Sequence, residues 1–175
     1  MFRLALINPN TDEHHTEAMG GVARAALPDG CDVTAVNPNR GPTSIESAAD
    51  SVVAAAEVAA LVQALPDFDA YLIACFGDPG LDAARELTAA PVIGIGEAAY
   101  IAASLVAKRF GVITTLPRSI PALEEASTRS ACGRAAPGSC RSTSPLPSRA
   151  AATRTRPRRS LRWASAWRPT TAPTP

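Results

Sequence analysis

The stretch Asp69-Ala-Tyr-Leu-Ile-Ala-Cys-Phe-Gly-Asp-Pro-Gly-Leu-Asp-Ala-Ala-Arg-Glu86 decides how the chain is interpreted. Its apolar run Tyr71–Ala74 predicts a buried strand, and Pro79–Glu86 predicts a helix with proline in its first turn. Cys75 stands at the junction, where free backbone N–H groups and a helix dipole favour thiolate over thiol. Cys75 is therefore a candidate nucleophile or proton-transfer base, although a free cysteine is more often a small buried hydrophobic residue.

Outward from this stretch, strand and helix patterns alternate along the chain. The expected strands are Leu4–Ile7, Asp32–Val36, Tyr71–Ala74, Pro91–Ile95 and Phe110–Ile113. The expected helices are Asp12–Ala26 with Thr11 as its cap, Ser47–Leu65 with Val52, Ala56, Ala59 and Val62 on its apolar face, Pro79–Glu86, Glu97–Lys108, and one starting at Ser119–Ala126. Apolar strands separated by helices are typical of an α/β fold with a parallel sheet covered on both faces.

Polar loops follow several of these strands. In parallel sheets, ligands bind at the carboxyl ends of the strands. The segments expected at that edge are Asn8–Thr11, Asn37–Ile45, Cys75–Asp78 and Thr114–Thr115. Together they predict a site for a small anionic or amide-bearing ligand, although each Asn, Thr or Ser alone is more often a turn or cap residue.

Charge divides the chain into two kinds of sequence. All 16 acidic residues precede Thr128, whereas ten of the 17 Lys and Arg residues follow it. The segment 128–175 is rich in Arg, Ala, Pro, Ser and Thr, so we expect it to be disordered or to be the translation of a shifted reading frame. No secretory signal, membrane span or disulfide framework is visible, and we expect a soluble cytoplasmic protein.

Five motifs resemble the Asp/Glu/hydantoin racemase superfamily, and most closely its hydantoin and allantoin racemase branch. The resemblance covers about Met1 to Glu125 in the family's order. The motifs are Ile7-Asn8-Pro9-Asn10-Thr11, Gly41-Pro42-Thr43-Ser44-Ile45-Glu46, Ala74-Cys75-Phe76-Gly77-Asp78-Pro79-Gly80-Leu81, Pro91-Val92-Ile93-Gly94-Ile95 and Arg109-Phe110-Gly111-Val112-Ile113-Thr114-Thr115.

The resemblance implies a cofactor-free racemase with two α/β lobes, each contributing one cysteine to the reacting carbon. Residues 1–95 would form the first lobe, 96–127 the beginning of the second, and 128–175 the basic tail. One thiolate would remove the α-proton of a hydantoin, allantoin or amino acid while the opposite thiol delivers a proton. Cys75 would be the first cysteine, and the residues implied to shape the substrate pocket are Asn10, Ser44, Ile45, Phe76, Gly77 and Thr115.

The second cysteine of this pattern is missing. It belongs to a Gly-Cys-Ala-Gly type element that does not occur here, and neither Cys132 nor Cys140 follows an apolar strand. We therefore expect an impaired, truncated racemase that retains at most one-sided proton exchange. The alternatives are a decarboxylase or isomerase of small dicarboxylates and a non-catalytic ligand-binding remnant, and a homo-oligomer is compatible with any of them.

Other signals are weaker. Gly94-Ile95-Gly96-Glu97-Ala98-Ala99 fits a loose dinucleotide fingerprint but lies outside the first strand-turn-helix unit. Adjacent residues on a helix point apart, so His14 and His15 do not predict a metal site. The unpatterned arginines of the tail do not predict nucleic-acid binding. Nucleic acid, membrane and metal are therefore not expected as partners.

Overall fold

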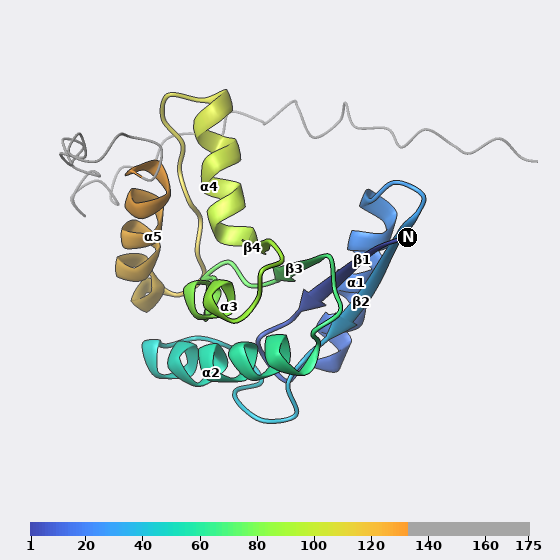
Figure 1. Cartoon of the computed structure of the whole chain (residues 1–175). Coiled ribbons are helices and arrows are strands. Elements are labelled where there is room, and N and C mark those ends of the chain that lie inside the picture. Colours follow the sequence, from blue (N-terminus) through green and yellow to red (C-terminus); the bar gives the residue numbers. More distant parts are fainter. Residues whose placement is uncertain (133–175) are drawn as a thin grey trace, which may run out of the picture. The chain divides into compact units, whose positions relative to one another are not determined.

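A computed structural model describes residues 1–132 of the chain, and side chains through residue 130 (Figure 1). Strands and helices alternate through the first 106 residues, as the sequence predicts. Their bounds are β1 Phe2–Ile7, α1 Glu13–Ala26, β2 Cys31–Val36, α2 Ala48–Ala64, β3 Ala70–Ile73, α3 Leu81–Leu87, β4 Val92–Gly94, α4 Ile95–Val106, the 3₁₀ helix η1 Pro117–Ser119, and α5 Ile120–Cys132.

The four strands form one parallel sheet in the order β2-β1-β3-β4. From β1 the chain first adds β2 on one side, and then crosses back to place β3 on the other side of β1. The strand order therefore reverses between β1 and β3. In open α/β sheets, ligands bind outside the carboxyl ends of the strands at such a reversal.

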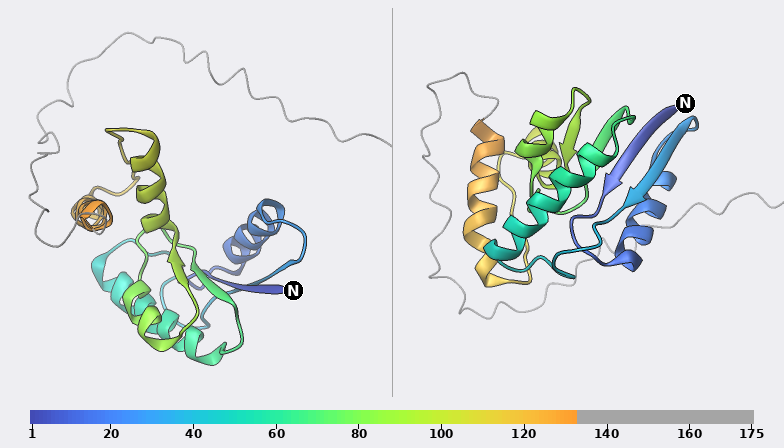
Figure 2. Two further views of the ribbon diagram at one scale, coloured as in Figure 1. Left: turned by 45° about the horizontal axis from the view of Figure 1, so that its top comes forward. Right: turned by 60° about the horizontal axis from the view of Figure 1, so that its bottom comes forward.

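Helices cover the two faces of the sheet, because alternate side chains of each strand point to opposite faces. Leu4, Leu6 and Val33 face α1, whose Met19 and Ala23 pack against them. The opposite face of the sheet packs against α2 and α3, and the buried side chains of that layer are Ala5, Ile7, Val58, Val62, Phe68, Tyr71, Ile73, Leu81, Ala84 and Val92. Figure 2 shows α1 on one side of the strands and α2 with α3 on the other.

Two local details differ from the sequence prediction. The N-cap of α1 is Asp12, whose carboxylate accepts from the His15 N–H, and not Thr11. The buried face of α2 consists of Ala54, Val58 and Val62, whereas Val52 is 71% exposed. Because nearly every position of α2 is apolar, the pattern does not show which face of the helix is buried.

The predicted fifth strand is wrong. Residues 110–113 form no strand, and Ile113 is 98% exposed. A strand needs a neighbour with free backbone groups, and β4 pairs over only three residues before the chain enters α4. The segment is instead held through the Phe110 ring, which lies 6.3 Å from the Tyr100 ring of α4.

The predicted division of the chain into lobes after residue 95 stays a prediction, whereas the expected start of the tail at residue 128 can be compared with the structure. Helix α5 continues through residues 128–132, past the expected start of the tail. The other expectations about the tail fall on residues 133–175, outside the described part of the chain. Within residues 1–132, no helix is long and apolar enough to cross a bilayer.

Candidate active site

Three of the predicted loops meet at the carboxyl edge of the sheet. Backbone hydrogen bonds extend the strand pairing beyond the strands, from Asn8 N–H to the Val36 carbonyl (2.8 Å) and from Ala74 N–H to the Ile7 carbonyl (2.8 Å). A third bond, from Thr11 N–H to the Pro42 carbonyl (3.1 Å), joins the loop after β1 to the loop after β2. The first residues after β1, β2 and β3 are therefore held at one edge.

Asn8 organises the first of these loops. Its side chain is buried, and its Nδ2 group donates to Asn10 Oδ1 (2.7 Å) and Thr16 Oγ1 (2.9 Å). Asn10 Oδ1 also accepts from the Asp12 N–H (2.9 Å). Both bonds go to the oxygen of the Asn10 amide, and its Nδ2 group has no partner among the described residues. Asn10 is thus a donor available to an external carbonyl or carboxylate.

Cys75 lies in a tight turn rather than at the start of a helix. The Asp78 N–H donates to the Cys75 carbonyl (2.9 Å), which closes the turn. Helix α3 begins only at Leu81, after Gly80, whose φ of 78° and close approach to α2 exclude a side chain. The predicted helix start at Pro79 is therefore two residues early, and the thiol lies outside the first turn of α3.

The environment of the thiol corrects a second expectation. Burial raises the pKa of Cys75, and the nearby carboxylate of Asp78 raises it further, while a hydrogen bond from the Gly77 N–H opposes both effects. Thiolate is thus disfavoured, contrary to the sequence prediction. At neutral pH the resting side chain is a protonated thiol.

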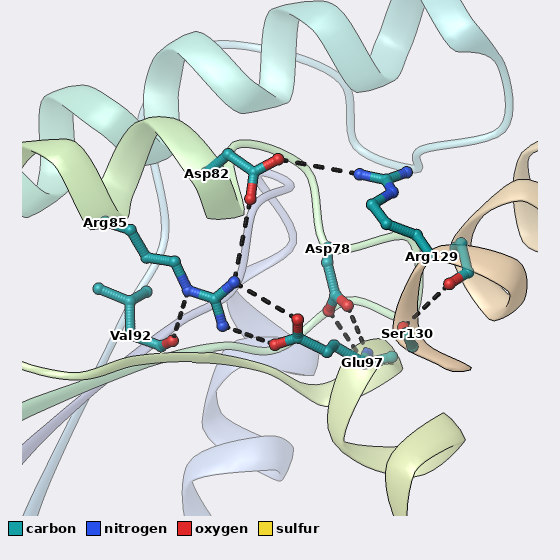
Figure 3. Close-up of polar contacts among 9 residues, drawn as sticks. Asp78, Asp82, Arg85, Val92, Glu97, Arg129 and Ser130 are labelled. Carbon is teal, nitrogen blue, oxygen red and sulfur yellow. Dashed lines mark hydrogen bonds and ion pairs between the residues drawn. The ribbon is translucent and has the colours of Figure 1, made fainter. Parts of the chain in front are cut away.

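Asp78, the last residue of the Cys75 turn, binds the N-terminus of α4 through its carboxylate (Figure 3). Its Oδ1 accepts from the Gly96 N–H (2.9 Å) and its Oδ2 from the Glu97 N–H (2.6 Å), at the first turn of α4. These donors serve the carboxylate and not the thiol. Sequence reasoning missed this role, and an aspartate before a proline gives no signal of a partner 18 residues away.

The same contact explains the glycines of the loose dinucleotide fingerprint. A Cβ at Gly94 would lie 2.3 Å from Cγ of Asp78, and a Cβ at Gly96 would lie 2.1 Å from the Phe76 carbonyl oxygen. Both distances are far below contact. These glycines are required for the turn to approach α4, and this requirement accounts for them without a nucleotide.

A pocket of about 230 Å³ is lined by Gly77 and Asp78 of this turn together with residues of α3, α4 and α5. Cys75 does not line it. Its charged side chains are already paired, because Arg85 binds Glu97 (2.5 Å) and Arg129 lies 3.8 Å from Asp82 (Figure 3). The open edge beside Cys75 is therefore the better candidate site.

The remaining predicted pocket residues lie in two other segments, one before and one after the Cys75 turn in the sequence. Ser44 is exposed and Ile45 is half-buried, at the end of the loop after β2, and Thr115 is exposed. An ion pair of 3.9 Å between Arg118 and Glu46 ties the segment after α4 to that loop. Within residues 1–130, no hydrogen bond or ion pair joins these three residues to Cys75, so their place in a substrate pocket stays a prediction.

Cys31 is the other cysteine whose side chain the structure describes, and it lies far from Cys75. Cys31 begins β2 and pairs with Phe2, whereas Cys75 follows the end of β3. The six residues of β2 span about 20 Å at roughly 3.3 Å each. Cys31 therefore lies at the amino ends of the parallel strands and Cys75 at their carboxyl ends, so the two thiols cannot face one substrate.

A parallel α/β sheet with polar loops and a cysteine at its carboxyl edge defines a protein with a small-molecule site. The chain belongs to the Asp/Glu/Hydantoin racemase family, whose model matches residues 4–171. This match confirms the resemblance drawn from the motifs.

Individual relatives agree. The chain is 43% identical over 120 residues to a hydantoin racemase of Paenarthrobacter aurescens, which covers 66% of this chain and 50% of the relative. It is 41% identical over 125 residues to a hydantoin racemase of a Pseudomonas species, covering 70% of this chain and 50% of the relative. The structure resembles that of an allantoin racemase from Klebsiella pneumoniae, with a TM-score of 0.72 and 43% identity, covering 75% of this chain and 54% of the other. The chain thus spans about half the length of the curated relatives it matches.

Proposed function

We propose that this chain is a cofactor-independent racemase of the hydantoin type in which Cys75 exchanges the proton on the carbon next to a ring carbonyl. The observation that carries the proposal is the position of Cys75, at the carboxyl edge of β3 beside the strand reversal, in a chain of this family. Hydantoins and allantoin carry such a carbon next to a ring carbonyl, and amino acids carry the corresponding carbon next to a carboxylate. The names of the relatives favour the ring compounds.

The environment of Cys75 suits proton transfer to and from carbon. A carbon acid of this kind is weak, and the raised pKa of Cys75 makes its thiolate a stronger base while lowering the fraction of thiolate at neutral pH. The negative charge that develops on the carbonyl oxygen needs hydrogen-bond donors. We assign this task to the unpartnered amide of Asn10 and to backbone N–H groups of the turn.

Substrate contacts are proposed for six residues. Phe76 and Gly77 stand on the exposed side of the same turn as Cys75, and the hydrogen-bonded loops bring Asn10 to the same edge. The ring of Phe76 is 38% exposed and offers an apolar surface to a side chain on the substrate ring. The full proposed set is Asn10, Ser44, Ile45, Phe76, Gly77 and Thr115.

Inversion needs a second acid on the opposite face of the carbon. Among the described side chains, Cys31 lies at the wrong edge of the sheet, while Cys132 and Cys140 lie outside that part of the chain. We therefore propose that this chain exchanges the α-proton on one face faster than it inverts the carbon. This is the impaired racemase predicted from the missing Gly-Cys-Ala-Gly element.

The test is incubation of a single enantiomer of a 5-substituted hydantoin in D₂O. Mass spectrometry measures deuterium incorporation, and chiral chromatography measures inversion. We expect incorporation to exceed inversion after subtraction of the spontaneous rate, and to be lost in Cys75→Ser but retained in Cys31→Ser. Rapid inversion by the purified chain would contradict the one-sided mechanism.

The same samples distinguish the two alternatives. Release of CO₂ from a small dicarboxylate, dependent on Cys75, would favour the decarboxylase. Ligand-induced protection from unfolding without exchange or turnover would favour the binding remnant. Neither result is expected.

A further inference from the structure

The turn that carries Cys75 has a strained residue at its end. Asp78 has a φ of 46°, and it is the one non-glycine residue with positive φ within residues 1–132. The left-handed conformation is unfavourable for a residue with a side chain, and aspartate tolerates it better than most. A conformation of this kind persists only where surrounding contacts hold it.

Those contacts come from the first turns of α4. The carboxylate of Asp78 accepts from the N–H groups of Gly96 and Glu97. These groups lie in the first turn of α4 and have no partner within the helix. The Phe76 ring, two residues earlier, packs against the Tyr100 ring at 5.3 Å. The turn is thus fixed to α4 on both sides of Gly77, and the position of Cys75 depends on this attachment.

The carboxylate also places a charge near the thiol. After burial, which raises the pKa of Cys75 most, and the Gly77 N–H bond, which lowers it, the charge of Asp78 raises this pKa further. From α4, Glu97 faces Asp78 and Tyr100 is affected by its charge, and from α3, Arg85 attracts it. Arg85 is already bound to Glu97, at 2.5 Å. Because Arg85 is engaged with Glu97, it balances the negative charge of Asp78 only in part.

We propose that Asp78 is the positioning residue for Cys75: its carboxylate ties the catalytic turn to the N-terminus of α4 and places a negative charge beside the thiol. That this turn is catalytic rests on the proposed function, whereas its attachment to α4 and the charge beside the thiol do not. In this arrangement the helix terminus stabilises the aspartate, and the charge of the aspartate adds to the burial of the thiol, the larger cause, in opposing ionisation of Cys75. Asp78 acts through Cys75 and needs no contact with substrate.

The test measures the alkylation of Cys75 by iodoacetamide across pH values from about 6 to 10. Peptide-resolved mass spectrometry separates Cys75 from the other three cysteines. The variants are Asp78→Asn and Asp78→Ser, which are both neutral and both keep an acceptor for the α4 N–H groups. The matched control is Asp82→Asn, which removes the same charge from an exposed side chain at the start of α3.

We expect both Asp78 variants to fold and to lower the midpoint of the alkylation profile. Their rate at neutral pH should rise about threefold or more, because thiolate is the reacting species. Asp82→Asn should leave the midpoint unchanged. An unchanged midpoint in a folded Asp78 variant, or an equal shift in Asp82→Asn, would overturn the proposal.

The exchange assay separates this proposal from the proposed function. If no variant exchanges a substrate proton but the alkylation midpoint falls only in the Asp78 variants, the racemase proposal fails and the role of Asp78 stands. If Cys75 supports exchange but its alkylation profile ignores Asp78, the racemase proposal stands and the role of Asp78 fails.

Discussion

At the scale of single residues, the candidate site depends on two side chains that do no chemistry. Asn8 is buried beneath the loop after β1 and fixes the amide of Asn10. Asp78 holds the turn after β3 against α4. Each places a second residue, Asn10 or Cys75, at the edge of the sheet. Of the two positioning residues, Asn8 is buried, whereas Asp78 is half-buried like Asn10 and Cys75.

Replacement of Asn8 by alanine tests the first of these roles. The variant loses the bonds from Nδ2 to Asn10 Oδ1 and Thr16 Oγ1, so that Asn10 Oδ1 keeps only the Asp12 N–H as donor and Thr16 Oγ1 loses its donor. We expect a loss of about 1–3 kcal/mol in the free energy of unfolding, measured by urea denaturation. Asn39→Ala, at an exposed position of the neighbouring loop, is the control and should be nearly neutral. Equal stability of the two variants would show that Asn8 does not organise the loop.

The protonation of Cys75 predicts a pH dependence of stability. The folded state raises the pKa of this thiol, so the unfolded chain ionises first as the pH rises. The stabilisation is complete below the unfolded pKa of about 8.5 and is lost as the pH climbs through the folded pKa. Wild type should therefore lose stability relative to Cys75→Ser between pH values of about 8 and 10, in paired urea titrations. A stability difference independent of pH would mean that the thiol is not perturbed by folding.

At the scale of helices and strands, much was predictable because the strands are apolar and polar turns separate them. The strands β1 to β4 and the helices α1 to α4 were recognised from that pattern, and so was the edge that gathers the polar loops. The predicted strand at 110–113 failed because apolar content does not reveal whether a pairing neighbour exists. The bond between Asp78 and α4 was also hidden, since a cap 18 residues distant has no local signal.

The contact between the turn and α4 makes a prediction about packing. In Gly96→Ala the new Cβ would lie 2.1 Å from the Phe76 carbonyl oxygen, so the turn or the helix must move. We expect a loss of roughly 1–3 kcal/mol, as for other overpacked sites, together with altered alkylation of Cys75.

The control for that variant is Gly21→Ala in α1, where nothing lies within 4 Å of the added atom. It should stabilise the protein by up to about 1 kcal/mol, because alanine is the better helix former. Calorimetry measures the stability of both variants, and we expect the two changes to have opposite signs. A neutral Gly96→Ala variant would show that the turn does not pack closely on α4.

At the scale of the whole molecule, apolar side chains are exposed at and beyond the end of α4. Leu105 is 74% exposed, Val106 is 87% exposed, and Ile113 is 98% exposed. Exposed apolar surface of this kind favours association. We expect the chain to self-associate in a concentration-dependent way, and the homo-oligomer considered from the sequence would arise through this region.

Analytical ultracentrifugation checks that expectation. The double variant Leu105→Lys and Ile113→Lys should shift the chain towards monomer, while Val22→Lys, at a 71% exposed position on α1, should not. Identical sedimentation of all three proteins would place any association elsewhere.

The central claim, that Cys75 exchanges the α-proton of a hydantoin-type substrate, is tested most directly by one rate. That rate is the initial deuterium incorporation into a 5-substituted hydantoin in D₂O, measured for wild type and for Cys75→Ser. We predict that wild type exceeds the spontaneous rate and that Cys75→Ser falls to it. Equal incorporation by the two proteins, or none above background in wild type, would contradict the account.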